Sequence, residues 1–371
     1  MIFHNTTYKK KTSPLDRGMR GVSQSPRQFL ITIIPLVFLL LNSCEKQEVG
    51  PQCPTCQEEI TATTTDILIG CEGNFGWGNA SLSRYNPNTK IVSNQVFQNV
   101  NGFNMGDVLQ DMKEVNGTLY VTMNNSGKIV MIDTSNYTFL GEITGFNSPR
   151  FMQALANKMY VSDLYADAIQ IVDLTSKTIT GSIATQRWTE HLLIHQGYLY
   201  ATAPDTNWVF KINTITDVIE DTIIVGKAPS GIVLDKNNKI WILSAGGTSS
   251  ELATLKKYNP VNSQIEQTFS FTTLAESPNT LRMDNLGEIL YFLNDGLQSM
   301  SILDNTIPSI KNVSTNGSVF YGMNVDPHNR DVYITDAVDY VQQGKVYRYD
   351  SIFQPLDTFT VGIIPQSIWF K

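Results

Sequence analysis

Histidine and cysteine are scarce in this 371-residue chain, with four of each, and no GxSxG, Walker or GxGxxG pattern occurs in it. Charge is modest, because 27 Lys and Arg stand against 34 Asp and Glu. This balance excludes a basic nucleic-acid binder, which needs many cations to neutralise phosphates. With 42% hydrophobic residues and ordinary glycine and proline usage, the composition also excludes a disordered, collagen-like or coiled-coil chain.

The amino terminus carries a short apolar run that is typical of an export signal. Residues 29–41 are 13 uncharged residues that follow six basic ones, and they are too few to span a bilayer, which needs about 20. Met19 is a second candidate start. The run ends in Leu41-Asn42-Ser43-Cys44, which resembles a lipobox. We expect removal of residues 1–43 and diacylation of Cys44; an ordinary signal peptide with an incidental cysteine is the alternative.

Cleavage would change the charge of the chain. It removes six basic and one acidic residue, which leaves 21 basic against 33 acidic residues and a net charge of −12. An acidic body is repelled by anionic lipid, so only acyl chains would hold it at a membrane. The first mature residues, Glu45-Lys46-Gln47-Glu48, resemble the export tag of surface-displayed lipoproteins. We therefore expect a lipid-anchored protein of the outer membrane, exposed on the cell surface.

The other cysteines agree with export. Cys53 and Cys56 form a CxxC within the tether expected over residues 44–65, and Cys71 follows it. No βαβ pattern surrounds the CxxC, and no second one exists to complete a zinc site. A local disulfide is favoured over redox catalysis or metal binding.

From about residue 66 onward, one sequence pattern recurs: an apolar-aromatic-apolar strand, a polar loop, and a second strand that ends in Asp or Asn and a turn. The Asp or Asn position recurs at intervals of 47, 40, 40, 46, 45 and 46 residues, at Asn86, Asp133, Asp173, Asn213, Asn259, Asp304 and Asp350. Periods of 40–50 residues built from short strands indicate a β-propeller with one four-stranded sheet per blade. The sequence therefore predicts an all-β, seven-bladed propeller over residues 66–371, with each Asp or Asn closing a turn onto its own backbone.

The two ends of the repeat region predict how the ring closes. The first repeat starts at the residues expected to form its second strand, Ile67-Leu68-Ile69, and lacks an innermost strand. After the last repeat, residues 364–370 match the sequence pattern of the innermost strands in the other repeats. We expect this C-terminal strand to complete blade 1 and to remove two exposed sheet edges.

Loops on one face of the expected ring are rich in aromatic and amide residues. In a propeller, the loops that enter the innermost strands and those between the second and third strands surround the same channel mouth. Exposed apolar loop residues often mark binding surface, although loops can also fold back onto the blade tops. From loop position we predict a ligand-binding site made of Phe75, Trp77, Phe103, Asn104, Arg150, Phe151, Tyr165, Trp188, His191, Asp205, Trp208, Asn279 and Tyr321, with Arg150 a candidate for a ligand phosphate.

Catalysis has little support in the sequence. His191 and His195 fall on an expected strand, where residues four apart lie about 13 Å apart and cannot chelate one ion. Glu190 beside His191 could be an acid–base pair, but strand alternation is expected to point the two side chains to opposite faces. We expect no catalytic residues, no metal and no catalytic cofactor.

Three segments near the start of the repeat region carry a more specific signal: Glu72-Gly73-Asn74-Phe75-Gly76, Ser81-Leu82-Ser83-Arg84-Tyr85-Asn86-Pro87 and residues 106–112. Together they resemble the opening blade of YncE-like seven-bladed lipoproteins of Gram-negative gut bacteria. These include the cobalamin-binding BtuG family, which works with a TonB-dependent outer-membrane transporter. The resemblance covers most of residues 66–371. It implies capture of cobalamin or another corrinoid at the cell surface and transfer to such a transporter.

Cobalamin is a large flat corrin with amide edges and a nucleotide tail, so aromatic contacts with Asn, Gln, Ser and Tyr partners would suit it. A rigid mouth would lose little entropy on binding. The alternatives are another ligand (a siderophore, haem or a glycan), a protein-interaction platform, or a propeller lyase or lactonase. That enzyme would need a metal or a His/Glu pair at the channel mouth.

Overall fold

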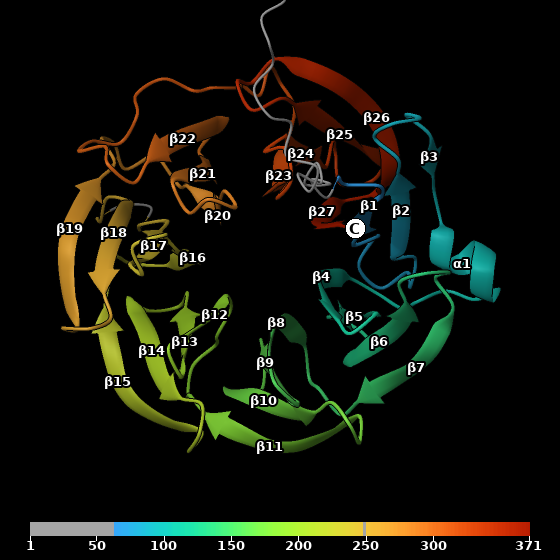
Figure 1. Cartoon of the computed structure of the whole chain (residues 1–371), viewed down its shortest axis with the longest axis horizontal. Helices are drawn as coiled ribbons and strands as arrows, with labels where there is room; N and C mark the ends of the chain where they lie inside the picture. The colour runs from blue at the N-terminus through green and yellow to red at the C-terminus, as the bar shows by residue number, and fades with distance from the viewer. Residues whose placement is uncertain (1–62, 248–249) are drawn as a thin grey trace, which may run out of the picture. The chain divides into compact units, whose positions relative to one another are not determined.

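Seven antiparallel sheets stand around a common axis in the computed structural model (Figure 1). It describes residues 63–247 and 250–371, so the predicted signal peptide, Cys44 and the Cys53–Cys56 pair lie outside the described residues. The all-β, seven-bladed propeller expected from the repeat is confirmed. One short helix, α1 (Val96–Asn101), lies between blades 1 and 2 at the periphery. Within the described residues, no helix is long and apolar enough to cross a membrane.

Each blade runs from an innermost strand at the axis to an outermost strand at the periphery. Blade 1 consists of β27 (Pro365–Phe370), β1 (Ile67–Cys71), β2 (Ser81–Tyr85) and β3 (Val92–Ser93). Blade 2 consists of β4 (Leu109–Val115), β5 (Thr118–Met123), β6 (Lys128–Asp133) and β7 (Phe139–Thr144). Blade 3 consists of β8 (Pro149–Leu155), β9 (Lys158–Asp163), β10 (Ala168–Asp173) and β11 (Thr178–Ala184).

The remaining blades follow the same order from the axis outward. Blade 4 consists of β12 (Leu192–His195), β13 (Tyr198–Ala203), β14 (Trp208–Asn213) and β15 (Val218–Ile224). Blade 5 consists of β16 (Pro229–Leu234), β17 (Ile240–Ser244), β18 (Thr254–Asn259) and β19 (Gln264–Ser270). Blade 6 consists of β20 (Asn279–Met283), β21 (Ile289–Leu293) and β22 (Leu297–Ser301), and blade 7 of β23 (Phe320–Val325), β24 (Val332–Asp336), β25 (Gln343–Tyr349) and β26 (Pro355–Ile363).

The C-terminal strand closes the ring as predicted. β27 pairs antiparallel with β1, with Ile69 opposite Ile368, and it occupies the innermost position of blade 1. Blade 1 is therefore assembled from both ends of the propeller sequence. This arrangement pairs an edge that β1 would otherwise leave open.

The predicted turns between third and fourth strands are present in six blades. In each, the Asp or Asn side chain accepts the backbone N–H two residues on, at 2.7 to 3.0 Å. These short-range bonds satisfy the turn backbone without help from the rest of the fold. In blade 6, Asp304 instead accepts the N–H of Ser301.

Blade 6 corrects the expectation of four strands in every blade, because its described sheet has three. Beyond β22, only an isolated bridge joins Leu297 to Val313. Pro308 lies in this stretch and has no backbone N–H to give to a ladder, while its carbonyl accepts the side-chain N–H of Gln298. The Gln298 side chain thus occupies the Pro308 carbonyl, a backbone acceptor that could otherwise have joined the ladder of a fourth strand.

The core lies between the blades. Seven apolar clusters fill the interfaces, and each combines residues of two neighbouring blades. The aromatic centres of the second strands are almost fully buried, namely Tyr120, Tyr160, Tyr200, Trp241, Tyr291 and Tyr333. Burial of such large side chains is the main stabilising term of the ring. Strand aromatics such as Tyr120 and Tyr160 therefore serve packing.

Candidate functional site

The innermost strands present their side chains to the axis in three successive rings. The lower ring contains the residues paired opposite the central residue of each second strand: Lys113, Gln153, Leu193, Val233, Arg282, Asn324 and Trp369. The middle ring lies two residues earlier, at Asp111, Phe151, His191, Gly231, Thr280, Gly322 and Ser367. The mouth ring lies one residue earlier again, at Gln110, Arg150, Glu190, Ser230, Asn279, Tyr321 and Gln366.

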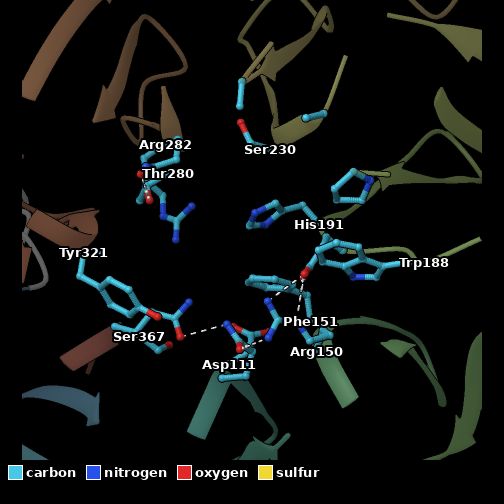
Figure 2. A pocket seen from close by; sticks show the side chains of 18 residues that line it. Asp111, Arg150, Phe151, Trp188, His191, Ser230, Thr280, Arg282, Tyr321 and Ser367 are labelled. Carbon is cyan, nitrogen blue, oxygen red and sulfur yellow. Dashed lines mark hydrogen bonds and ion pairs between the residues drawn. The ribbon is translucent and has the colours of Figure 1, made fainter. Parts of the chain in front are cut away.

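A cavity of about 280 Å³ opens at the face where the innermost strands begin, which we call the entry face. All seven mouth-ring residues line it, together with six of the middle ring, Trp188 and Arg282. Figure 2 shows these side chains converging from all sides. Two further cavities, of about 210 and 410 Å³, lie beside the lower ring. The cavity at the mouth has the size of a small-molecule site or of one part of a larger ligand.

A polar belt runs along half of the mouth ring. Glu190 pairs with Arg150, whose Nε lies 2.9 Å from Glu190 Oε1, and Arg150 also donates to the side-chain oxygen of Gln110. Gln110 in turn donates to Gln366 Oε1 at 2.9 Å. These four residues belong to blades 4, 3, 2 and 1 in that order, so the belt fixes the relative positions of four neighbouring blades.

An aromatic wall faces the cavity from blades 3 and 4. The rings of Phe151 and His191 lie 4.1 Å apart between centroids, tilted by 39°, and Trp188 lines the cavity beside them. Burial, with the nearby cations Arg282 and Arg150, lowers the pKa of His191 to about 3. The imidazole is therefore neutral at physiological pH and acts as a flat, weakly polar surface.

On the opposite side, Tyr321 donates its hydroxyl to Glu72 Oε1 at 3.0 Å. Glu72 directly follows β1, and burial raises the pKa of its carboxyl to about 7, against the opposing effects of Tyr321 and Arg150. Burial likewise raises the pKa of Asp111 to about 6, opposed by the N–H of Met152. The carboxyl group of Asp111, in the cavity lining, and that of Glu72, behind Tyr321, thus both have pKa values raised toward neutral pH.

No group of three or more His, Cys, Asp or Glu side chains placed to hold a metal ion occurs in residues 63–247 and 250–371.

Comparison with known proteins gives the family. A family model described as "Domain of unknown function (DUF5074)" matches residues 66–354. The chain belongs to the DUF5074 family. No curated protein matches this DUF5074 chain.

Solved structures share the fold of this DUF5074 protein at low identity. A protein from Lactobacillus plantarum is 12% identical, with a TM-score of 0.64 over 83% of this chain and 100% of that one. A quinonprotein alcohol dehydrogenase-like protein from Bacteroides thetaiotaomicron is 13% identical, with a TM-score of 0.62 over 83% and 78%. A protein from Bacteroides fragilis, named as a candidate 6-phosphogluconolactonase, is 12% identical, with a TM-score of 0.62 over 85% and 100%. At these identities, the likeness concerns the fold alone.

Six of the predicted site residues of the DUF5074 chain come together in the cavity lining: Arg150, Phe151, Trp188, His191, Asn279 and Tyr321. Three others lie in entry-face loops outside the lining and are about three-quarters exposed, namely Phe75, Trp77 and Tyr165. Two hydrogen bonds hold the loop of Phe75 in place. The Asn74 side-chain amide donates to the Tyr340 carbonyl, and the Gly76 N–H donates to the Asp107 carboxylate. We call these three exposed aromatics, which lie on the entry face outside the cavity wall, the rim aromatics.

The other four predicted residues lie away from the lining. Phe103 packs edge-on against Phe97 of α1 and Phe139 of β7, at 5.3 Å from each, because α1 carries the chain to the periphery before β4. Asn104 is exposed next to it. Asp205 is exposed, and Trp208 packs against Phe210, with the Arg187 guanidinium 5.6 Å from its ring centroid.

One expectation about the mouth needs correction. Glu190 and His191 were expected on opposite faces, but both line the cavity. The equivalent neighbouring residues of other blades line it too, because irregular pairing interrupts strand alternation at the mouth ends of β4, β8, β20 and β23. Sequence reasoning also missed Gln110, Asp111, Gln366 and Arg282. The first three occupy innermost-strand positions equivalent to those of Arg150 and Phe151, so alignment of the repeats could have identified them.

Proposed function

We propose that this DUF5074 protein is a surface lipoprotein of the outer membrane that captures cobalamin or a related corrinoid at the entry face and passes it to a TonB-dependent transporter. The proposal extends the established family and fold to a ligand, an anchor and a partner. It treats the protein as a binder and not as an enzyme.

The mouth cavity is the observation that carries the proposal. One side offers flat contact surface in Phe151, His191 and Trp188, and the rest offers amide and hydroxyl groups, including Asn279 and Ser367. A corrin presents a flat apolar ring with amide side chains, so this mixture of partners suits it. A volume of about 280 Å³ would receive part of so large a ligand, with the rim aromatics Phe75, Trp77 and Tyr165 available to the remainder.

Export and anchoring are supported by the sequence. The lipobox-like Leu41-Asn42-Ser43-Cys44 and the acidic residues after it suit acylation and surface display, and the EGNFG stretch at Glu72 resembles the BtuG family. Transfer to a TonB-dependent transporter follows from the same resemblance.

A binding role also agrees with the state of the groups at the mouth. Burial lowers the pKa of His191 to about 3, so its imidazole is too weak a base to hold a proton at neutral pH, and Glu190 is engaged by Arg150. Neither is therefore poised as a general base.

Isothermal titration of the purified propeller tests the ligand. We expect heat with cobalamin and cobinamide, and none with haem, a ferric siderophore or a neutral oligosaccharide. Absence of binding by every corrinoid would overturn the cobalamin proposal, and binding of another compound would redirect it. Lactonase turnover at the wild-type mouth, abolished in His191→Gln, would overturn the non-enzymatic role.

Matched variants locate the ligand. Phe151→Ala should weaken corrinoid binding at least tenfold, which corresponds to about 1.4 kcal/mol. Ile215→Ala, at an exposed turn of blade 4 on the opposite face, should leave affinity unchanged. Trp77→Ala tests the rim separately. Equal affinity in wild type and Phe151→Ala would exclude the cavity as the corrinoid site.

The anchor is tested independently of the ligand. Radiolabelled palmitate should be incorporated into the wild-type protein and not into Cys44→Ser, and whole-cell protease treatment should degrade the wild-type protein. Palmitate incorporation into Cys44→Ser would overturn the assignment of Cys44.

A further inference from the structure

Arg282 is a cation that the polar belt does not use. It belongs to the lower ring, on β20 opposite Tyr291. It lines the mouth cavity as well as both cavities beside the lower ring, and it faces His191 in Figure 2. Its only hydrogen bond among the described residues is from Nη1 to the carbonyl of Leu281, at 2.9 Å. It forms no ion pair with any described residue, so most of its five N–H donors are free.

The middle ring leaves the path above Arg282 open. Its own blade contributes Thr280 there, and the flanking blades contribute Gly231 and Gly322. A Cβ at Gly231 would lie 2.6 Å from the Leu281 Cβ, and a Cβ at Gly322 would lie 2.1 Å from the Gln366 carbonyl oxygen. Neither position tolerates a side chain. No side chain from these two positions therefore stands between the Arg282 guanidinium and the mouth cavity.

Arg150, the residue that the sequence suggested for a ligand phosphate, is in a different state. Its guanidinium is held by both carboxylate oxygens of Glu190 and by Gln110. A ligand anion at Arg150 would have to compete with an ion pair already formed. Arg282 has no such competitor within contact.

The charges around Arg282 are few. Asp111 is near enough to influence its titration but forms no ion pair with it, and desolvation in the channel lowers the pKa of the guanidinium. Lys113 points away, toward Gln153 Oε1 at 3.3 Å. Ser367 and Thr280 line the same side of the cavity with hydroxyl groups. A desolvated guanidinium with free donors and neighbouring hydroxyls is a favourable site for an anionic oxygen.

We propose that Arg282 is the anion-binding residue of the mouth cavity, and that the ligand directs a phosphate or phosphodiester group to it while its flat part lies against Phe151 and His191. The phosphate assignment rests on the cavity alone, and its extension to a corrinoid nucleotide loop rests on the proposed function.

Inorganic phosphate is the first probe. Phosphate in place of chloride at equal ionic strength should raise the Tm of the wild-type protein and of Arg187→Gln, a control at the exposed Arg187. The rise should be absent in Arg282→Gln and partly kept in Arg282→Lys. Without phosphate, Arg282→Gln should melt at or above the wild-type temperature, because it removes an unpaired charge. No rise in the wild type, or an equal rise in Arg282→Gln, would overturn the inference.

A pair of corrinoids then links the site to the ligand. Cobinamide lacks the nucleotide loop and its phosphodiester, so Arg282→Gln should lose at least tenfold in affinity for cobalamin and less than twofold for cobinamide. Equal losses for both would overturn the phosphodiester assignment. If the wild type binds neither corrinoid but keeps the phosphate effect of Arg282, the proposed function fails and the anion site stands.

Discussion

Arg150 and Glu190 join blade 3 to blade 4 at the channel mouth, with Arg150 Nη2 2.8 Å from Glu190 Oε1. The pair is largely shielded, since 21% of the arginine side chain and 7% of the glutamate side chain are exposed. Burial raises the pKa of Glu190, and Arg150 opposes that effect. The ion pair therefore keeps charge on a carboxylate that would otherwise be costly at this depth.

Removing one partner should cost more than removing both. Arg150→Met should lower the free energy of unfolding by about 2 kcal/mol at pH 7.5, because it leaves Glu190 buried without a counter-ion. The double variant Arg150→Met/Glu190→Met should recover most of that loss. Urea unfolding measures both, and a double variant no more stable than the single one would contradict this account.

Glu72 should make stability depend on pH in a defined direction. Its folded pKa of about 7 lies above the ordinary glutamate pKa of 4.5, so between these pH values the folded protein keeps a proton that the unfolded chain has lost. This contribution to stability is full below about pH 4.5 and disappears as the pH rises through 7. Glu72→Gln should match the wild type at pH 5 and exceed it by about 2 kcal/mol at pH 8.5.

The control for Glu72 is Glu251→Gln, at an exposed position, whose difference from the wild type should stay constant over this range. Denaturant unfolding at half-unit pH steps provides both curves. A flat difference for Glu72→Gln would show that the carboxyl titrates as in solvent.

Deletion of residues 362–371 should abolish folding. It removes β27, which pairs with β1 and supplies Ile368 to the core between blades 7 and 1. The ring would then open at blade 1 and expose unpaired sheet edges. Thermal unfolding by circular dichroism should show no cooperative transition, whereas Lys371→Ala should still melt cooperatively. A truncated protein with the wild-type Tm would refute closure by β27.

Cys71 should report the opening of the same blade. Its thiol is fully buried in β1, and burial raises its pKa to about 12. In a variant with serine at positions 44, 53 and 56, iodoacetamide should not modify Cys71 until denaturant unfolds the ring. Mass spectrometry measures the modified fraction, and rapid labelling under native conditions would mean that β1 separates from its neighbours without global unfolding.

The fold could be predicted from the sequence because its signals are local and repeated. The Asp or Asn turns act within two residues, and an apolar second strand occurs seven times, six of them with an aromatic centre, so both the blade count and the C-terminal closure were predictable. Asp304 carries the same signal, but Pro308 beyond it removes a donor, and the fourth strand of blade 6 does not form.

The site was predictable only in part, because loop position does not say how far a side chain lies from the axis. Arg150, Phe151 and Tyr321 start innermost strands and converge. Phe103 does not, because the short α1 turns that segment outward. Arg282 was missed because its reach depends on Gly231 and Gly322, which come from other repeats and become its neighbours only in the closed ring.

Gln366 and Ser367 of the cavity lining lie on β27, the last strand of the propeller in chain order. A chain that has not yet paired this strand with β1 therefore lacks part of the pocket wall. Occupancy of the pocket should in turn oppose separation of these strands by mass action. Closure of the ring and completion of the pocket thus depend on the same strand pairing.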